Sequence, residues 1–215
     1  MDEIVLRSML KWPNVPSVYG WLRLDRRGRW SIRMPSAVER GDTGKSSGSP
    51  VGTPRFERIV NPAMIEFIGR NYMHDAEGRY FFQNGPQRVF VALEYTPWVY
   101  RLDGSGQSLV AHTGAEAGSP RAAFFDERGG LVLACDPGVG VVLDRDLAVL
   151  AERFADRAGN ALAPETLMER ARAGYSVRAR LMGTDLTVSS IRSEEVAARF
   201  DFVARPTPPA GEPDC

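Results

Sequence analysis

The sequence holds few side chains of the kinds that carry metal-ion or nucleophilic chemistry. Its two histidines, His74 and His112, lie far apart, and neither has a second histidine or a cysteine at the short spacings of a zinc site. The Gly-x-Ser-x-Gly run at residues 44–48 lies in a Gly- and Ser-rich stretch that cannot form the helix a nucleophile elbow needs, so it predicts no hydrolytic serine. The acidic pair Glu194–Glu195 lies where a helical turn is expected to begin, so helix capping explains it. We therefore expect no metal, no cofactor and no catalytic residue of a recognisable class.

An enzyme whose site is assembled from residues distant in the sequence is an alternative hypothesis. His74, Asp75 and His112 are the first candidates for such a site, because imidazole and carboxylate groups can exchange a proton with a substrate. The hypothesis requires the folded chain to bring both imidazoles and the carboxylate to one open cleft.

Aromatic side chains are densest between residues 80 and 100, where charged residues interrupt them. Most of these rings belong in a hydrophobic core, but the polar groups among them can edge a small apolar pocket. The candidate ligand-binding residues are His74, Arg88, Glu94, Tyr95, Trp98 and Arg101. This pattern favours a non-catalytic module that binds a small ligand or a protein partner.

Arginines gather in residues 21–33, where the turn 25–28 joins two predicted strands. Because side chains alternate along a strand, Arg23, Arg29 and Arg33 are expected on the same sheet face as Trp21, and the turn itself contains two more arginines. Such a face can bind single-stranded RNA, with candidates Trp21, Arg23, Arg26, Arg27, Arg29 and Arg33. However, 27 basic residues balance 27 acidic ones, so no overall field attracts nucleic acid. RNA binding is therefore the weaker alternative.

Between residues 79 and 143 the apolar residues alternate with a period of two, which predicts strands. Short turns between these strands indicate an antiparallel meander. The strands are expected at 79–83, 87–94, 98–102, 107–112, 121–125 and 130–135, with others at 18–24, 29–34, 175–182, 186–191 and 199–204.

Helices are expected at 2–10, 144–154 and 164–171, with one helical turn at 193. A further helix begins at Asn61-Pro62, since asparagine is a good N-cap and proline suits the first helical position. Its apolar stripe extends to Tyr72, and residues 74–78 end it. These elements indicate an α+β fold with mostly antiparallel sheet and a few packed helices.

We expect two packed subdomains, residues 1–115 and 116–204. The first includes a Gly- and Ser-rich flexible loop at 41–54, and a proline-rich disordered tail follows at 205–215. An Asp-x-x-Gly turn follows a predicted helix at 75–78 and again at 156–159. Duplication and coincidence both explain this weak internal repeat.

The sequence favours a cytoplasmic protein. Two cysteines cannot build a disulfide framework, and Cys135 lies in an apolar run that predicts a buried thiol. The chain begins with Met1-Asp2-Glu3, acidic where a secretory signal is basic. No apolar run approaches the roughly 18 residues that would span a bilayer, so we expect no membrane partner. The oligomeric state stays open.

Three stretches, residues 19–25, 61–72 and 78–100, resemble a bacterial family of uncharacterised proteins. The resemblance covers most of residues 15–160 and implies no catalytic residue. More distantly, the order of helix, Asp-x-x-Gly turn, aromatic strand and proline turn is similar to another bacterial family of unknown function. That resemblance implies two related α+β repeats and a regulatory or signalling role.

Overall fold

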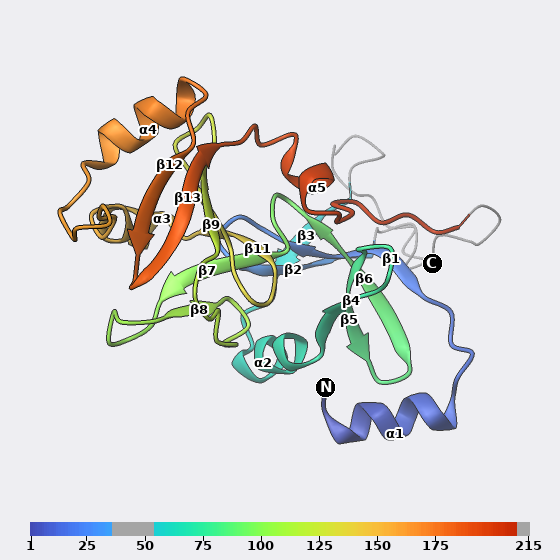
Figure 1. The fold of residues 1–215 in the computed structure, drawn as a ribbon. Helices are drawn as coiled ribbons and strands as arrows, with labels where there is room; N and C mark the ends of the chain where they lie inside the picture. Colours follow the sequence, from blue (N-terminus) through green and yellow to red (C-terminus); the bar gives the residue numbers. More distant parts are fainter. Residues whose placement is uncertain (36–53, 210–215) are drawn as a thin grey trace, which may run out of the picture.

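A computed structural model describes residues 1–35 and 54–209 of the chain. It consists of two mixed β-sheets with helices packed against them (Figure 1). The first sheet has six strands in the order β3-β2-β1-β6-β5-β4, and the second has seven in the order β12-β13-β9-β10-β11-β7-β8. Most neighbouring strands are antiparallel, so the predicted α+β class is confirmed. No helix in the described ranges is long and apolar enough to cross a bilayer.

The strands of the first sheet and the helices beside it come from the N-terminal half of the chain. They are α1 (Glu3–Lys11), β1 (Val18–Leu24), β2 (Trp30–Arg33), β3 (Phe56–Arg58), α2 (Pro62–Arg70), β4 (Tyr72–His74), β5 (Tyr80–Asn84) and β6 (Gln87–Leu93). As expected, Asn61 caps α2, since its side-chain oxygen accepts a 3.2 Å hydrogen bond from the Met64 amide.

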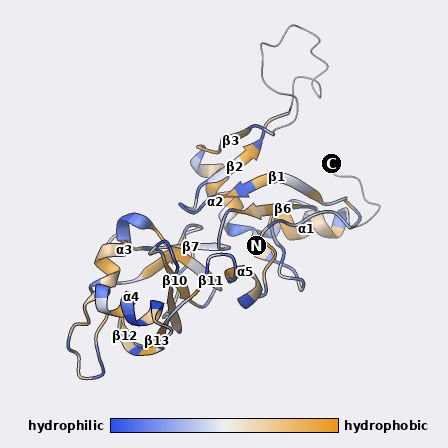
Figure 2. Ribbon diagram, turned by 90° about the horizontal axis from the view of Figure 1, so that it is seen from above, coloured by the Kyte–Doolittle hydropathy of each residue, from blue (hydrophilic) through white to orange (hydrophobic). Residues whose placement is uncertain are grey.

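The remaining elements build the second sheet and its cover. They are β7 (Trp98–Leu102), β8 (Leu109–Ala111), β9 (Ala122–Phe125), β10 (Leu131–Ala134), β11 (Val139–Val142), α3 (Asp144–Ala151), α4 (Pro164–Arg172), β12 (Val177–Leu181), β13 (Thr184–Ser190) and α5 (Val196–Arg199). Figure 2 shows this lobe, with α3, α4, β12 and β13, beside the lobe that contains β1, β2, β3 and β6.

Asp-x-x-Gly turns recur at five places in the described part of the chain. In each, the glycine amide donates to the aspartate carbonyl, and the carboxylate accepts the amide four residues on. Each glycine has a positive φ, which glycine adopts without steric cost. The turns are 25–28, 75–78, 103–106, 126–129 and 156–159.

The two sheets repeat one topology. The hairpin β1–β2 closes with Leu24 opposite Trp30, and β9–β10 closes with Phe125 opposite Leu131. The first strand of each hairpin then pairs in parallel with the last strand of its unit, β6 or β13. The third strand lies antiparallel to the second in both units, and a helix, α2 or α3, follows it. We call β1–β6 with α2 the first repeat and β9–β13 with α3 and α4 the second repeat.

The similarity extends to the far edge of each sheet. In the first repeat the Gln83 amide donates to the Asn71 carbonyl at 2.9 Å, and in the second the Arg180 amide donates to the Ala155 carbonyl at 2.7 Å. Helix α4 is inserted before β12 in the second repeat only. The same pairing of five strands in each sheet favours duplication over coincidence, which residue identity alone left open.

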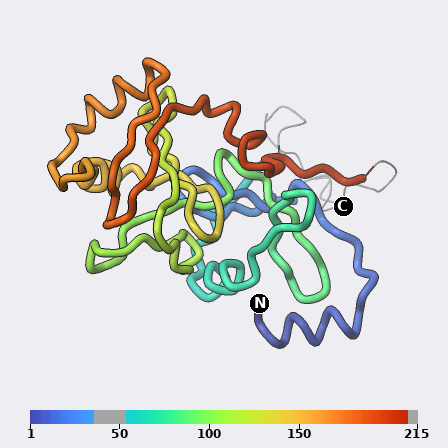
Figure 3. The backbone as a smooth tube through the Cα atoms, viewed as in Figure 1, coloured from blue at the N-terminus to red at the C-terminus, as the bar shows by residue number. Residues whose placement is uncertain are grey.

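The chain crosses between the sheets twice. After β6 it passes to β7, which joins the second sheet parallel to β11. After β13 it returns through α5 to the first sheet, where Val203 bridges Arg79 and the Leu93 amide donates to the Ala204 carbonyl; Figure 3 shows this return in red. The change of sheet therefore lies at residues 94–97, ahead of the boundary near residue 115 that the sequence indicated for the subdomains.

Several local predictions need correction. Strands β6 and β7 are sequential but do not pair, and the parallel pairs β1–β6, β7–β11 and β9–β13 break the expected meander. Strands β3, β4 and β11 were not predicted, because two are only three residues long and glycine interrupts the third. The expected strand 199–204 is instead the end of α5, a turn and one bridge at Val203.

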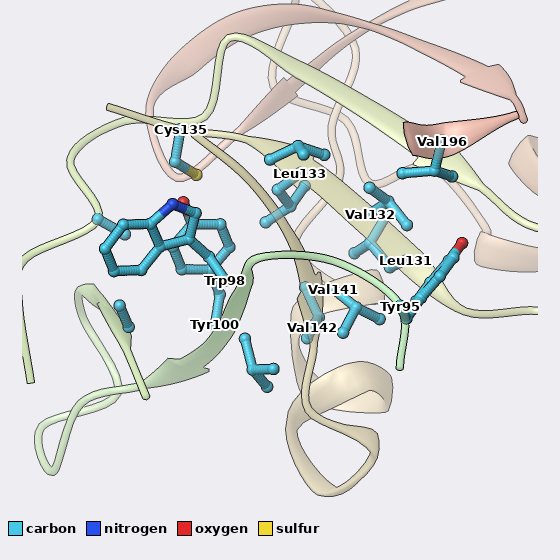
Figure 4. Packing of buried hydrophobic residues seen from close by; sticks show 14 of the residues in the cluster. Tyr95, Trp98, Tyr100, Leu131, Val132, Leu133, Cys135, Val141, Val142 and Val196 are labelled. Carbon is cyan, nitrogen blue, oxygen red and sulfur yellow. The ribbon is translucent and has the colours of Figure 1, made fainter. Parts of the chain in front are cut away.

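Most of the predicted loop 41–54 and the end of the predicted tail lie outside the described residues. Within the described part of the tail, Pro206 is buried. The core is continuous between the sheets. Figure 4 shows Trp98, Tyr100 and Cys135 at one end of its buried layer and Tyr95 with Val196 at the other.

Candidate ligand-binding groove

An open groove of about 590 Å³ lies on the outer face of the first sheet. Strand pairing places Arg23 opposite both Ser31 and Ala92, and Arg33 opposite Phe56, so the four strands β1, β2, β3 and β6 supply its floor. The further lining residues are Gly20, Leu24, Asp25, Pro54, Leu93, Glu94, Arg205 and Pro206. Its volume falls within the range of small-molecule sites.

The groove is rich in guanidinium groups. Arg23 lies over the Phe56 ring, 3.9 Å from its centroid, and Arg33 lies 5.5 Å from the Trp21 centroid. No carboxylate among the described residues lies within ion-pair distance of Arg23, which leaves the edge of its stacked guanidinium open to a ligand. A stacked arginine presents parallel N–H donors that match a carboxylate or a phosphate.

Two acidic residues, Asp25 and Glu94, limit the positive charge of the groove. Asp25 is already engaged, because its carboxylate accepts the Arg27 and Arg29 amides and forms a 2.5 Å ion pair with the Arg29 side chain. Glu94 is exposed. The structure thus brings Glu94, a predicted ligand-binding residue, into one groove with Arg23 and Arg33, which the RNA hypothesis had named.

A second polar cluster joins the two repeats beneath the β1–β2 turn. The Asp126 carboxylate is fully buried and accepts hydrogen bonds from the Tyr95 hydroxyl at 3.0 Å and the Arg26 guanidinium at 3.1 Å. The Arg26 guanidinium also stacks over the Tyr95 ring at 3.9 Å. Burial, followed by the Asp126 charge, raises the pKa of Tyr95. No buried polar side-chain atom of Arg26, Tyr95 or Asp126 lacks a hydrogen-bond partner, and these bonds connect the first repeat to the second.

The hairpin arginines do not form one free basic face. Arg26 is bound to Asp126 and Arg29 to Asp25, while Arg27 lies 4.0 Å from Asp144. Only Arg23 and Arg33 of this segment line the groove.

His112 belongs to an aromatic cluster between the sheets, together with Trp98. Its ring lies 5.3 Å from the Trp30 ring, 5.7 Å from Tyr72 and 5.8 Å from Trp98, measured between centroids. Its Nδ1 accepts from the Val99 amide, and its buried Nε2 has no hydrogen-bond partner among the described residues. Burial lowers the pKa of His112 to about 3, so the imidazole is neutral at physiological pH.

The other predicted residues lie apart from the groove. His74 is exposed on the edge strand β4, with its Nδ1 2.9 Å from the Asp75 carbonyl, while the Asp75 carboxylate is bound to Arg79. Arg88 is exposed on β6 over Phe81. Arg101 is half-buried on β7. His74 and His112 therefore do not face one open cleft, and no cluster of metal-ligating side chains is found among the described residues.

Phe56 and Arg205 are among the groove residues that the sequence analysis did not name as candidates. Phe56 lies on a three-residue strand, and Arg205 follows the Val203 bridge that returns the chain to the first sheet. The run Arg55-Phe56-Glu57-Arg58 was the available signal for Phe56, since an aromatic residue between arginines is typical of an exposed binding strand. Nothing local marked Arg205.

Comparison with known proteins gives a family and a distant structural likeness. The family model DUF2944, described as "Protein of unknown function (DUF2946)", matches residues 1–207. A solved structure, a DUF1285 family protein from Silicibacter pomeroyi DSS-3, is similar with a TM-score of 0.46 and 15% identity over 83% of this chain and 85% of that one. Among curated proteins no match is found. The predicted resemblance to a family of unknown function is confirmed.

Proposed function

The chain belongs to this family of proteins of unknown function (DUF2946). We propose that the protein is a non-catalytic binding module. In this proposal the groove on the first sheet receives an anionic group of a small ligand or of a protein partner. The observation that carries the proposal is the Arg23 guanidinium, stacked on Phe56 with no carboxylate partner in the described chain.

The other groove residues support the same conclusion. Arg33 and Arg205 add guanidinium groups around the Arg23 position, and Phe56 and Ala92 offer apolar surface beside them. A few polar groups around an apolar floor fix the orientation of a bound ligand. RNA binding is less well supported, because three arginines of the hairpin are matched to carboxylates of the chain itself.

We also propose that the protein works in the cytoplasm. Cys135 is a buried free thiol, and burial raises its pKa to about 12. Such a cysteine acts as a small apolar side chain and is typical of proteins that fold in a reducing compartment.

The groove can be tested with simple anions. Isothermal titration at low ionic strength would measure binding of citrate, glutarate and inorganic phosphate to the wild-type chain and to the Arg23→Gln variant. Loss of one charge-assisted hydrogen-bonding group should weaken binding by about tenfold or more. Binding should also weaken as salt is added, because the groove is open to solvent.

Arg88→Gln is the matched control, since Arg88 is also an exposed strand arginine stacked on a phenylalanine, with its guanidinium 4.9 Å from the Phe81 centroid. Arg88 does not line the groove, so the affinity of the Arg88→Gln variant for these anions should stay within about twofold of the wild-type affinity. The proposal is wrong if none of the three anions binds, or if Arg88→Gln weakens binding as much as Arg23→Gln does.

A further inference from the structure

The groove lies on one face of the first sheet. In the second repeat, the equivalent face of the second sheet is covered by a segment of the chain. The hairpin registers make Phe124 on β9 the counterpart of Arg23 on β1, because Phe125 and Leu24 hold the same hairpin position. Phe124 is covered by the segment that follows β13: the Phe200 ring packs edge-on against it at 5.6 Å, and the Arg199 guanidinium lies 4.9 Å from its centroid. A short helix and one aromatic ring thus close this face in the second repeat.

In the first repeat the chain takes a different path at the same point. The Glu94 amide donates to the Leu24 carbonyl, as the Ile191 amide donates to the Phe125 carbonyl in the second repeat. After Ile191 the chain forms α5 and covers its own sheet, but after Glu94 it leaves for β7 in the other sheet. No counterpart of α5 lies over Arg23 in the described ranges, and the groove occupies that place.

The chemistry of the two faces differs in charge. The covering segment of the second repeat places Arg199 on the Phe124 ring, whereas in the first repeat the arginine, Arg23, belongs to the sheet itself. A segment that covers the first repeat must therefore carry the opposite charge, while an aromatic side chain can pack against Phe56 and Ala92 as Phe200 packs against Phe124.

We infer that the groove binds an acidic peptide segment of a partner protein, one helical turn long, with a single aromatic side chain as its apolar anchor. The segment takes the place over β1 and β6 that α5 and Phe200 take over β9 and β13. Its carboxylates pair with Arg23 and Arg205, which line the groove. This inference rests on the proposed function and names the class of ligand.

The test uses fluorescence anisotropy with synthetic fluorescein-labelled peptides and the full-length chain. The probe is Asp-Glu-Val-Ala-Glu-Glu-Phe-Asp. One comparison peptide has alanine in place of phenylalanine, and another has amides in place of all the carboxylates. We expect the probe to bind about tenfold or more tightly than either comparison peptide, because each lacks one half of the recognition. The Arg23→Gln substitution should lower the affinity for the probe by about tenfold, whereas the Arg88→Gln variant should bind the probe within about twofold of the wild-type affinity.

The outcomes separate the inference from the proposed function. If citrate or glutarate binds with dependence on Arg23, but the probe binds no more tightly than its phenylalanine-free form, the peptide inference is wrong and the anion-binding function stands. If neither anions nor peptides bind, both are wrong. Equal binding of the uncharged peptide would also overturn the inference, since it would show that the arginines play no part.

Discussion

The Asp126→Ala substitution should separate the bonds that join the two repeats from those that make a turn. Asp126 and Asp25 hold the same position in equivalent Asp-x-x-Gly turns, and each carboxylate accepts the amides two and four residues on. In the first repeat the second carboxylate oxygen binds Arg29 of the same turn. In the second repeat Gly130 stands at that place, and Tyr95 and Arg26 bind the oxygen instead. Asp25→Ala is therefore the matched control.

The expected magnitudes follow from these partners. Removing one member of a buried ion pair costs about 3–5 kcal/mol, and the lower end applies because Arg26 is 26% exposed and can turn to water. A buried Tyr95 hydroxyl without its acceptor accounts for about 1–3 kcal/mol of that loss. The partly exposed pair of Asp25 with Arg29 lies within one turn and contributes about 1 kcal/mol. The turn bonds cancel in the comparison, so we expect Asp126→Ala to be about 2 kcal/mol more destabilising than Asp25→Ala.

Urea denaturation followed by circular dichroism and by tryptophan fluorescence would measure both variants. Asp126→Ala should lower the midpoint more, and Tyr95→Phe should reproduce part of that loss. Equal free energies of unfolding for the two alanine variants would refute the reasoning, because they would show that the contacts between the repeats add nothing beyond the turn.

Two further predictions concern the buried His112 ring and the close backbone contact at Gly78. As pH falls below about 6.5, the unfolded chain protonates His112 whereas the folded protein, with a His112 pKa of about 3, does not. This group therefore removes roughly 1.4 kcal/mol of stability per pH unit toward pH 3. His112→Phe should remove that part of the pH dependence in urea melts at pH 7, 5.5 and 4.5, and unchanged slopes would contradict the assignment. Gly78→Ala would place a Cβ 2.1 Å from the Asp201 carbonyl oxygen, whereas Gly159→Ala, also in an Asp-x-x-Gly turn, meets nothing within 4 Å. Alanine at a positive φ costs about 1–2 kcal/mol in both variants. The additional clash means that Gly78→Ala should lower the melting temperature more than Gly159→Ala does. Equal melting temperatures would count against the packing of the C-terminal segment on the turn at residues 75–78.

Local sequence signals determined much of the secondary structure of this protein. The alternation of Leu22, Leu24, Trp30 and Ile32 predicted the first hairpin and put these four side chains on one face. The first three are buried, whereas Ile32 is 41% exposed. The Asn61-Pro62 pair predicted the start of α2 correctly. Such signals work because capping, turn formation and one-sided burial depend on residues close together in the chain.

The candidate site depended on contacts that no local signal specifies. Arg26 and Arg23 belong to one hairpin and looked alike in the sequence, yet one is bound to a buried carboxylate of the other repeat and the other lies over Phe56 in an open groove. The chain crossing at residues 94–97 decided which sheet face stayed open, and the return at Val203 brought Arg205 to its edge. The amino-acid sequence by itself determined the strands, turns and balance of charge, because these follow from neighbouring residues. Only the tertiary structure decided which arginines are paired, because a parallel pairing or a change of sheet brings together residues that share no local pattern.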